Sequence, residues 1–272
     1  MALRMQLLIL VLFSVAFLLP PGAQAGEIIG GWEARPHSRP YMAYVKIATW
    51  RGVKTCGGFL IRDDVVLTAA HCNDEQGKGI VVLGAHNIRK KEPREPRSQK
   101  IRVRRWIRHP KYNKMTQNND IMLLQLRKRA ELNDWVQPIP LPHPWPEVPV
   151  GTRCNMSGWG WMQVNPAKSS DVLQDVVLEV MADEVCERNL TKPYDAKSML
   201  CAGDPRGKKA TLKGDSGGPL VCDGVPQGIV SWGPSNGASP EVYARVSRFV
   251  RWIRTVMKQL TPPDAPGISS RT

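Results

Sequence analysis

Lys213-Gly214-Asp215-Ser216-Gly217-Gly218-Pro219 places a serine between glycines. Glycine tolerates backbone angles and close approaches that other residues resist, so this segment can form a tight turn with its N–H groups pointing outward. A serine becomes a strong nucleophile when a base takes its proton and a third group orients that base. Candidates for both lie upstream: His71 in Leu67–Cys72, and Asp120 in Asn118–Leu124. The sequence therefore predicts a catalytic triad of His71, Asp120 and Ser216.

Further motifs in a fixed order make the chain resemble the chymotrypsin-like serine proteases. They extend from about Ile28 to about Leu260 and are Ile28-Ile29-Gly30-Gly31, Cys56-Gly57-Gly58, the histidine and aspartate segments, Ser157-Gly158-Trp159-Gly160, the serine segment and Ser231-Trp232-Gly233. The resemblance is to the granule-associated subgroup that holds granzymes B and H, cathepsin G and mast-cell chymase. The serine segment alone is equally compatible with a structural glycine turn, whereas the ordered set favours a protease.

The fold class expected is all-β. Short runs rich in Val, Ile and Leu recur between Gly, Pro, Asn and Asp, as in Tyr41–Ile47, Gly58–Ile61 and Gly228–Trp232. The resemblance implies two six-stranded antiparallel barrels, at about 28–136 and 150–245, with the catalytic cleft between them. His71 and Asp120 would lie on the first barrel and Ser216 on the second.

Two further segments complete the expected domain. The Pro-rich stretch Gln137–Pro149 is expected to connect the barrels. Apolar residues recur at helical spacing over 246–260 and predict a C-terminal helix packed on the second barrel. Residues 261–272 are Pro-rich and polar, which predicts a disordered tail.

The N-terminus has the pattern of a secretory signal. Arg4 precedes an apolar run, Leu7–Leu19, and the small residues around Ala25, which predicts a signal peptide over 1–25 and no membrane span after its removal. An uncleaved membrane anchor is the alternative. Residues 26–27 would then be an activation dipeptide before a protease domain over 28–260.

Activation is implied by the resemblance. Glu27 would keep the zymogen inactive until cleavage frees the α-ammonium of Ile28. That ammonium would pair with Asp215, because a buried charge is tolerated only when it is paired.

By the same resemblance, Ser216 Oγ attacks the scissile carbonyl while His71 accepts its proton and Asp120 orients the imidazole. The backbone N–H groups of Gly214 and Ser216 form the oxyanion hole. We expect no metal and no organic cofactor, since the chain has no dense acidic loop and no Cys-x-x-Cys pairs.

The substrate pocket is expected to include Ala210, Thr211, Ser231, Trp232, Gly233 and Glu241. Ala210 stands where the resemblance places an aspartate in trypsin-like pockets, and Glu241 stands where granzyme B has an arginine that selects acidic side chains. A carboxylate in a partly dry pocket attracts Lys or Arg and repels Asp and Glu. We therefore expect cleavage after Lys or Arg and, by resemblance to cathepsin G, after Phe, Tyr or Leu. The alternative is a chymase-like pocket in which Glu241 faces solvent or is neutralised.

Six cysteines allow several pairings. The resemblance selects three disulfides: Cys56 with Cys72, Cys154 with Cys222, and Cys186 with Cys201. Of two Asn-x-Ser/Thr sequences, the one at Asn189 lies in a polar stretch and is the expected glycan site, whereas Asn155 is expected to be buried.

The chain carries a formal net charge of +14, from 38 Lys and Arg against 24 Asp and Glu. Between Arg89 and Arg108, ten Lys or Arg stand against Glu92 and Glu95. This excess predicts binding to a sulfated, heparin-like glycosaminoglycan, although a merely solvated surface is the alternative. No sequence motif for reading nucleic acid is present, so binding there would be non-specific.

Together these features predict a monomeric serine endopeptidase, granule-stored or secreted, that cleaves proteins and peptides in immune defence or cytotoxicity. By resemblance, serpin-type inhibitors would control it. The alternative from another class is a cationic, non-catalytic antimicrobial protein on the same fold, and the intact triad favours the enzyme.

Overall fold

The computed structural model describes residues 30–73, 77–89, 98–144, 147–163, 168–207, 211 and 214–261. The predicted signal peptide, the activation residues Glu27 and Ile28, the pocket residue Ala210 and nearly all of the predicted tail lie outside these residues.

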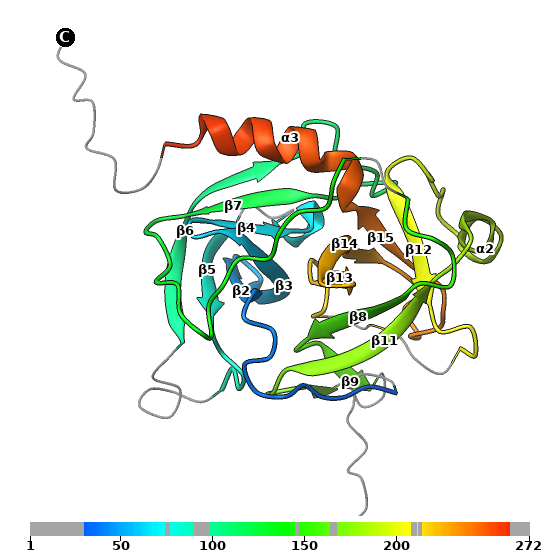
Figure 1. Cartoon of the computed structure of the whole chain (residues 1–272), viewed down its shortest axis with the longest axis horizontal. Helices are drawn as coiled ribbons and strands as arrows, with labels where there is room; N and C mark the ends of the chain where they lie inside the picture. The colour runs from blue at the N-terminus through cyan, green and yellow to red at the C-terminus, as the bar shows by residue number, and fades with distance from the viewer. Residues whose placement is uncertain are drawn as a thin grey trace, which may run out of the picture.

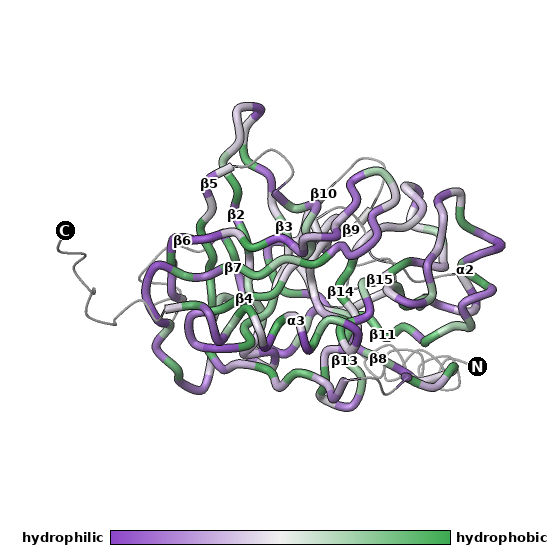
Figure 2. Tube along the Cα trace, turned by 90° about the horizontal axis from the view of Figure 1, so that it is seen from above, coloured by the Kyte–Doolittle hydropathy of each residue, from purple (hydrophilic) through white to green (hydrophobic). Residues whose placement is uncertain are grey.

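The first half of the chain forms a closed barrel of antiparallel strands, joined in the order β2-β3-β4-β7-β6-β5 (Figure 1). The strands are β2 (Met42–Thr49), β3 (Gly52–Arg62), β4 (Val65–Thr68), β5 (Lys78–Leu83), β6 (Gln99–Arg108) and β7 (Met122–Leu126). Every residue of β4 and β7 is buried, and apart from Thr68 and Gln125 these strands consist of Val, Leu and Met. Figure 2 shows hydrophobic colour through β4 and hydrophilic colour along much of β6.

The second half forms another ring of antiparallel strands. They are β8 (Arg153–Gly158), β11 (Gln174–Val180), β12 (Met199–Gly203), β13 (Pro219–Cys222), β14 (Val225–Trp232) and β15 (Glu241–Arg245). β8 pairs with both β13 and β11, which closes the ring of six. A separate hairpin joins β9 (Trp161–Gln163) to β10 (Lys168–Ser169). The prediction of two six-stranded antiparallel barrels is confirmed.

Both ends of the described chain cross to the other barrel. Strand β1 (Trp32–Glu33) precedes the first barrel in sequence but pairs with β11 of the second. The C-terminal helix α3 (Val246–Gln259) leaves β15 and lies over β6 and β7 in Figure 1. The helix packs against β14 of the second barrel, as expected, and it also contacts the first barrel, which the sequence did not predict.

Contacts along α3 explain its path. Its apolar stripe includes Phe249 and Ile253, which belong to the same buried cluster as Leu124 of the first barrel. Arg62 Nη1 donates to the carbonyl of Met257 at 2.9 Å. Burying this stripe requires an apolar surface, and the first barrel supplies much of it.

The structure forms the three disulfides that the resemblance implied, with Cα–Cα distances of 6.3 Å for Cys56–Cys72, 4.3 Å for Cys154–Cys222 and 5.9 Å for Cys186–Cys201. The first joins β3 to the short helix η1 (Ala70–Asn73), the second joins β8 to β13, and the third joins α2 (Asp183–Asn189) to β12. Each restricts the unfolded chain and so favours the fold.

Candidate active site

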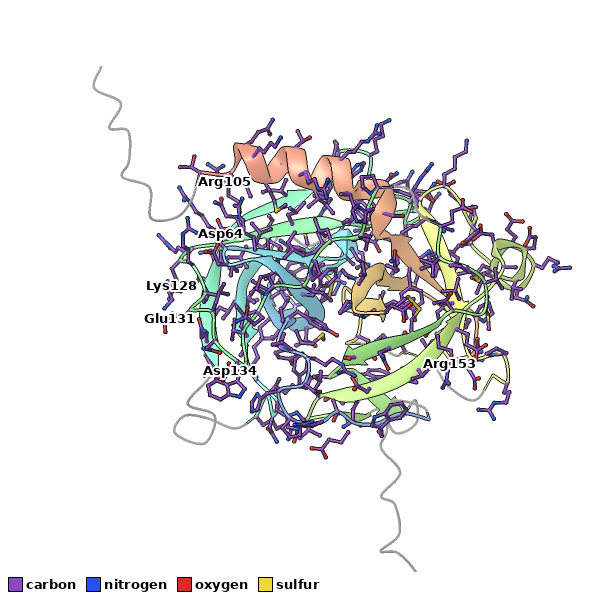
Figure 3. All side chains as sticks on the ribbon, viewed as in Figure 1. Asp64, Arg105, Lys128, Glu131, Asp134 and Arg153 are labelled. Atoms are coloured by element: carbon purple, nitrogen blue, oxygen red, sulfur yellow. A yellow bond between two sulfur atoms is a disulfide. The ribbon has the colours of Figure 1, made fainter. Side chains whose placement is uncertain are left out.

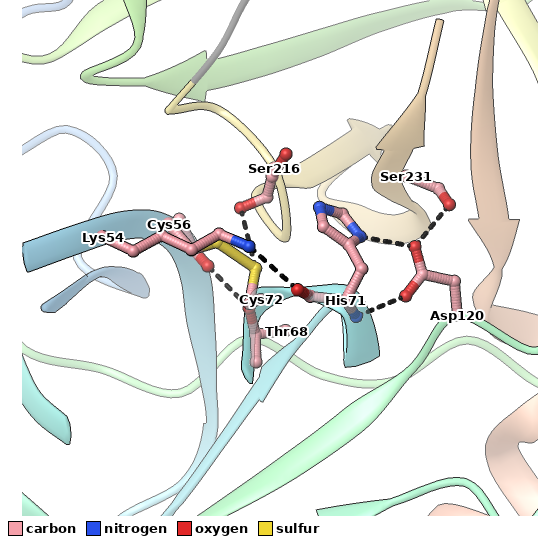
Figure 4. Close-up of a disulfide and its surroundings, with 9 residues drawn as sticks. Lys54, Cys56, Thr68, His71, Cys72, Asp120, Ser216 and Ser231 are labelled. Carbon is pink, nitrogen blue, oxygen red and sulfur yellow. Dashed lines mark hydrogen bonds and ion pairs between the residues drawn. A yellow bond between two sulfur atoms is a disulfide. The ribbon is translucent and has the colours of Figure 1, made fainter. Parts of the chain in front are cut away.

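Three segments that are far apart in sequence meet where the barrels face each other (Figure 4). His71 lies on η1, directly after β4. Asp120 precedes β7, and Ser216 lies on the turn before β13. The structure thus brings together the three residues of the predicted triad.

The carboxylate of Asp120 holds the imidazole of His71 in one orientation. Asp120 Oδ2 lies 2.7 Å from His71 Nδ1, and Oδ1 accepts the backbone N–H of His71 at 2.9 Å. An ionised carboxylate only accepts, so Nδ1 carries the proton in this pair and Nε2 is left as the acceptor. Figure 4 shows Nε2 on the side of the ring that faces Ser216.

A third donor reaches the same carboxylate from the second barrel. Ser231 Oγ donates to Asp120 Oδ2 at 2.5 Å. Burial of Asp120 opposes its ionisation, but the neighbouring charge of His71 and the hydrogen bonds from His71 and Ser231 outweigh it, so the pKa of Asp120 lies below its ordinary value. Asp120 therefore remains ionised at neutral pH.

The turn that carries Ser216 requires glycine on both sides. Gly214 has φ +103° and Gly217 has φ +83°, a region that other residues rarely adopt. A Cβ at Gly217 would also overlap the Thr68 side chain and the carbonyl of Gly57. The carbonyl of Ser216 accepts the N–H of Gly57 at 2.8 Å, and Gly217 N–H donates to Val230 at 2.8 Å. The turn is thus fixed to both barrels.

Asp215 is fully buried beside this turn. Its Oδ1 accepts the N–H of Gly160 at 2.9 Å. A Cβ at Gly158 or at Gly160 would overlap its carboxylate, so the Ser-Gly-Trp-Gly segment makes room for it. The predicted partner, the α-ammonium of Ile28, lies outside the described residues.

A pocket of about 200 Å³ opens beside Ser216. All five of the described residues that the sequence predicted for the pocket line it. The full lining is Thr211, Ser216, Val230, Ser231, Trp232, Gly233, Pro234, Ser235 and Glu241.

Glu241 is 4% exposed and lines this pocket. Thr211 donates to Glu241 Oε1 from its backbone N–H at 2.8 Å and from its hydroxyl at 2.6 Å, and the Tyr243 hydroxyl donates to Oε2 at 2.9 Å. Burial raises the pKa of Glu241 to about 7 against the opposing effect of these hydrogen bonds. The alternative in which Glu241 faces solvent is therefore inconsistent with the structure.

The comparisons with known proteins agree with this geometry. The model of the Trypsin family matches residues 28–253. Cathepsin G of Homo sapiens is 52% identical over 248 residues, which are 91% of this chain and 94% of the relative. Granzyme B of Homo sapiens is 53% identical over 251 residues, 92% of this chain and 98% of the relative. A solved structure described as "Structure of GrC" superposes with a TM-score of 0.79 at 43% identity and covers 84% of this chain and 99% of its own.

The chain belongs to the trypsin family. It is a serine protease of the granzyme and cathepsin G type. No helix of this trypsin-family protease is long and apolar enough to cross a membrane within the described residues.

Several contacts at the site could not be found from the sequence motifs. Ser231 was expected only as a pocket wall, yet its hydroxyl reaches Asp120. Tyr243 lies two residues after the expected pocket residue Glu241, and its hydroxyl donates a hydrogen bond to Glu241 Oε2. Lys54 Nζ donates to the carbonyl of His71 at 2.9 Å, and no motif identifies that lysine.

The two Asn-x-Ser/Thr sequences lie on elements of the second barrel, α2 and β8. Asn189 is exposed at the end of α2, where its side-chain amide donates to the carbonyl of Val185. Asn155 is half-buried in β8 and pairs with strands on both sides. Within the described ranges, no group of three or more His, Cys, Asp or Glu residues is placed to hold a metal ion.

Proposed function

We propose that this serine protease is a granule-stored, secreted endopeptidase in which Ser216 is the nucleophile, His71 the general base and Asp120 the residue that orients it. The observation that carries the proposal is the carboxylate of Asp120, which uses both oxygens on His71 and leaves Nε2 directed toward Ser216. A base held in one tautomer beside a serine is what nucleophilic catalysis requires.

The proposed reaction has two steps, acylation of Ser216 and hydrolysis of the acyl-enzyme. Ser216 Oγ attacks the scissile carbonyl carbon as its proton passes to His71 Nε2, and the N–H groups of Gly214 and Ser216 hold the oxyanion. The C–N bond breaks as Nε2 returns the proton to the leaving amine. Water repeats the sequence on the acyl-enzyme, and the acid leaves with Ser216 restored.

Activation is proposed to require removal of residues 1–27, first the signal peptide over 1–25 and then Gly26-Glu27. Asp215 supports this step, because its carboxylate is fully buried beside Gly158 and Gly160, a position where an ion pair would hold a charge. By the family resemblance the α-ammonium of Ile28 would pair with it and hold the Ser216 turn in its working shape.

The pocket supports a preference for Lys or Arg and for large aromatic or aliphatic side chains before the cut. Glu241 contributes the carboxyl group at the pocket, and Gly233 contributes no side chain to block it. A carboxylate there disfavours Asp and Glu by repulsion in a site of low dielectric.

The first test is a cleavage profile over all side chains at the scissile position, with protein processed to begin at Ile28. We expect cleavage after Lys, Arg, Phe, Tyr and Leu. Ser216→Ala should reduce kcat by roughly 10⁶-fold while the near-UV circular dichroism is unchanged. Turnover by that variant, or cleavage after Asp in the wild type, would contradict the proposal.

A second proposed activity, binding of a sulfated polyanion, is favoured by the outer face of β6. Exposed side chains alternate with inward ones along this strand, and a bulge adds one more cation. Arg127 follows β7 and donates its N–H to the carbonyl of Arg102, which extends the basic surface. Figure 3 shows Arg105 and Lys128 at the outer edge of the first barrel. The exposed cations are Lys100, Arg102, Arg104, Arg105, Arg127 and Lys128.

Heparin chromatography tests this surface with a matched pair of triple variants. Replacing Arg102, Arg104 and Arg105 by Gln should lower the salt concentration of elution, because each phosphate- or sulfate-bound cation releases a counterion. Replacing Arg188, Lys192 and Lys197, which are exposed on the second barrel, removes the same charge. Equal shifts for both variants would show that net charge, and not this surface, binds heparin.

A further inference from the structure

Among the residues that the structure describes, the groups that donate hydrogen bonds to the carboxyl group of Glu241 carry no positive charge. Its three hydrogen bonds come from the backbone N–H and hydroxyl of Thr211 and from the hydroxyl of Tyr243. The charged group that faces it from the Ser216 turn is Asp215, which also disfavours ionisation of Glu241. This environment leaves the carboxyl group to gain or lose a proton without breaking an ion pair.

Within the described part of the chain, the other elements that pack around Glu241 add no charged group to its contacts. On its own strand, β15, Tyr243 is a titratable neighbour, and its hydroxyl has a pKa far above the ordinary value because it is buried. β12 pairs with Glu241 through Ala202, and the disulfide partner Cys186 of α2 contacts its backbone carbonyl. Lys192, which follows α2, places its Nζ 5.4 Å from the centre of the ring of Trp232 on β14. The same Nζ donates a hydrogen bond to Gln117 Oε1.

Thr211 and Tyr243 can form hydrogen bonds with the carboxyl group of Glu241 whether it is ionised or protonated. Hydroxyl groups of Thr and Tyr both donate and accept, so Thr211 Oγ1 or Tyr243 OH can reverse its hydrogen bond when the carboxyl group gains a proton. The N–H of Thr211 donates in both states. Both oxygens of the carboxyl group then keep a hydrogen-bond partner in either state, which lowers the cost of changing state.

A substrate side chain reaches this carboxyl group through the pocket beside Ser216. Gly233 stands at the wall, where a Cβ would lie 3.1 Å from Glu241 Cγ. Absence of a side chain at Gly233 therefore leaves Glu241 accessible from the pocket that also contains Ser216.

Resting on the proposed function, we propose that a single proton on Glu241 selects which class of side chain the pocket accepts. Ionised Glu241 accepts the ammonium of Lys or the guanidinium of Arg, and protonated Glu241 accepts an uncharged aromatic side chain. The enzyme would thus change its selectivity between an acidic compartment and a neutral medium.

The direction of the effect follows from the buried position. Burial raises the pKa of Glu241 to about 7, so the carboxyl group is mostly neutral in mild acid and mostly ionised in mild base. A bound cation favours the ionised form, so binding of a cation near pH 7 should release a proton.

The decisive kinetic measurement is the ratio of kcat/KM for a Lys peptide to kcat/KM for a Phe peptide. Two peptides that differ only in Lys or Phe before the scissile bond are assayed from pH 5.5 to 8.5 with protein that begins at Ile28. Any pH effect on the catalytic groups that is common to both substrates cancels in the ratio of their kcat/KM values. We expect the Lys-to-Phe ratio to rise by at least roughly tenfold with increasing pH.

Two variants separate a proton-controlled pocket from a merely structural role. Glu241→Gln should give a low ratio that does not change with pH. Tyr243→Phe removes one donor to the carboxylate and should move the midpoint to higher pH while the rise is retained. A flat ratio in a wild-type enzyme that cleaves both peptides would overturn the inference, whereas cleavage of neither would instead contradict the proposed function.

A binding measurement provides a readout that does not depend on turnover. Calorimetry of benzamidine binding to the Ser216→Ala protein, in two buffers with different ionisation enthalpies, reports protons released. We expect release near pH 7 and none when Glu241→Gln is added. Binding without proton release, or no benzamidine binding above pH 8, would also overturn the inference.

Discussion

Asp120 and Glu241 are two buried carboxyl groups on opposite sides of one cleft, and each accepts three hydrogen bonds. Their pKa values nevertheless shift in opposite directions, below the ordinary value for Asp120 and up to about 7 for Glu241. The difference lies in the donors: His71 can carry a charge, whereas Thr211 and Tyr243 donate as neutral groups. Three hydrogen bonds from neutral groups therefore do not offset the effect of burial at Glu241, whereas at Asp120 the charge that His71 can carry is the largest of the effects that lower the pKa.

The largest expected effect comes from removing the charge of Asp120. Asp120→Asn keeps the shape but presents an amide to His71, which favours the wrong tautomer of the imidazole. We expect kcat to fall by roughly 10⁴-fold, the size that such a change has in the triad of this family. Steady-state kinetics at pH 8 measure it, with heparin elution as a control for folding. A loss below tenfold would show that catalysis does not depend on the charge of Asp120, and the contrast drawn with Glu241 would fail.

An intermediate effect is expected on stability when the charge of Glu241 is removed. The pKa of Glu241 is higher in the folded protein than the ordinary 4.5, so the folded state binds this proton more tightly. Its contribution to the free energy of unfolding is therefore present below about pH 4.5 and is lost as pH rises through about 7. The loss amounts to at most about 3 kcal/mol.

Urea unfolding of wild type and Glu241→Gln across this range measures the contribution as a difference, which cancels the titration of other groups. Wild type should lose stability relative to the variant as pH rises from 4.5 to 8. A constant difference would mean that Glu241 titrates normally, and the contrast with Asp120 would disappear.

The smallest expected effect comes from removing the neutral donor to Asp120. Ser231→Ala leaves both contacts from His71 in place, so Asp120 should remain ionised and kcat should fall by only about tenfold. The measurement is kcat for the Phe peptide, whose binding does not involve the charge of Glu241. A loss as large as that of Asp120→Asn would show that the neutral donor, and not His71, governs the carboxylate.

Local motifs explain why the sequence predicts the barrels, the disulfides and the approach of His71 to Ser216. Each of these residues lies in a short segment whose order along the chain resembles one family. Ser231 and Asp120 are different, because their hydrogen bond joins residues 111 positions apart and depends on how β14 approaches the first barrel. The contacts of α3 with the first barrel were not predicted for a related reason: helical spacing shows an apolar stripe but not every surface that covers it.

The exchange of chain ends between barrels also determines what a single cut would do. Each of the three disulfides lies within one half, so no covalent bridge spans the connection at 127–152. A nick there would yield two polypeptides, yet β1 of one fragment would still complete a sheet of the other, and α3 would still cover its neighbour's strands. Such a nicked protein should behave as a non-covalent heterodimer that retains its cleft. The contacts of β1 and α3 with the opposite barrel, and not the peptide connection, would hold the two barrels together.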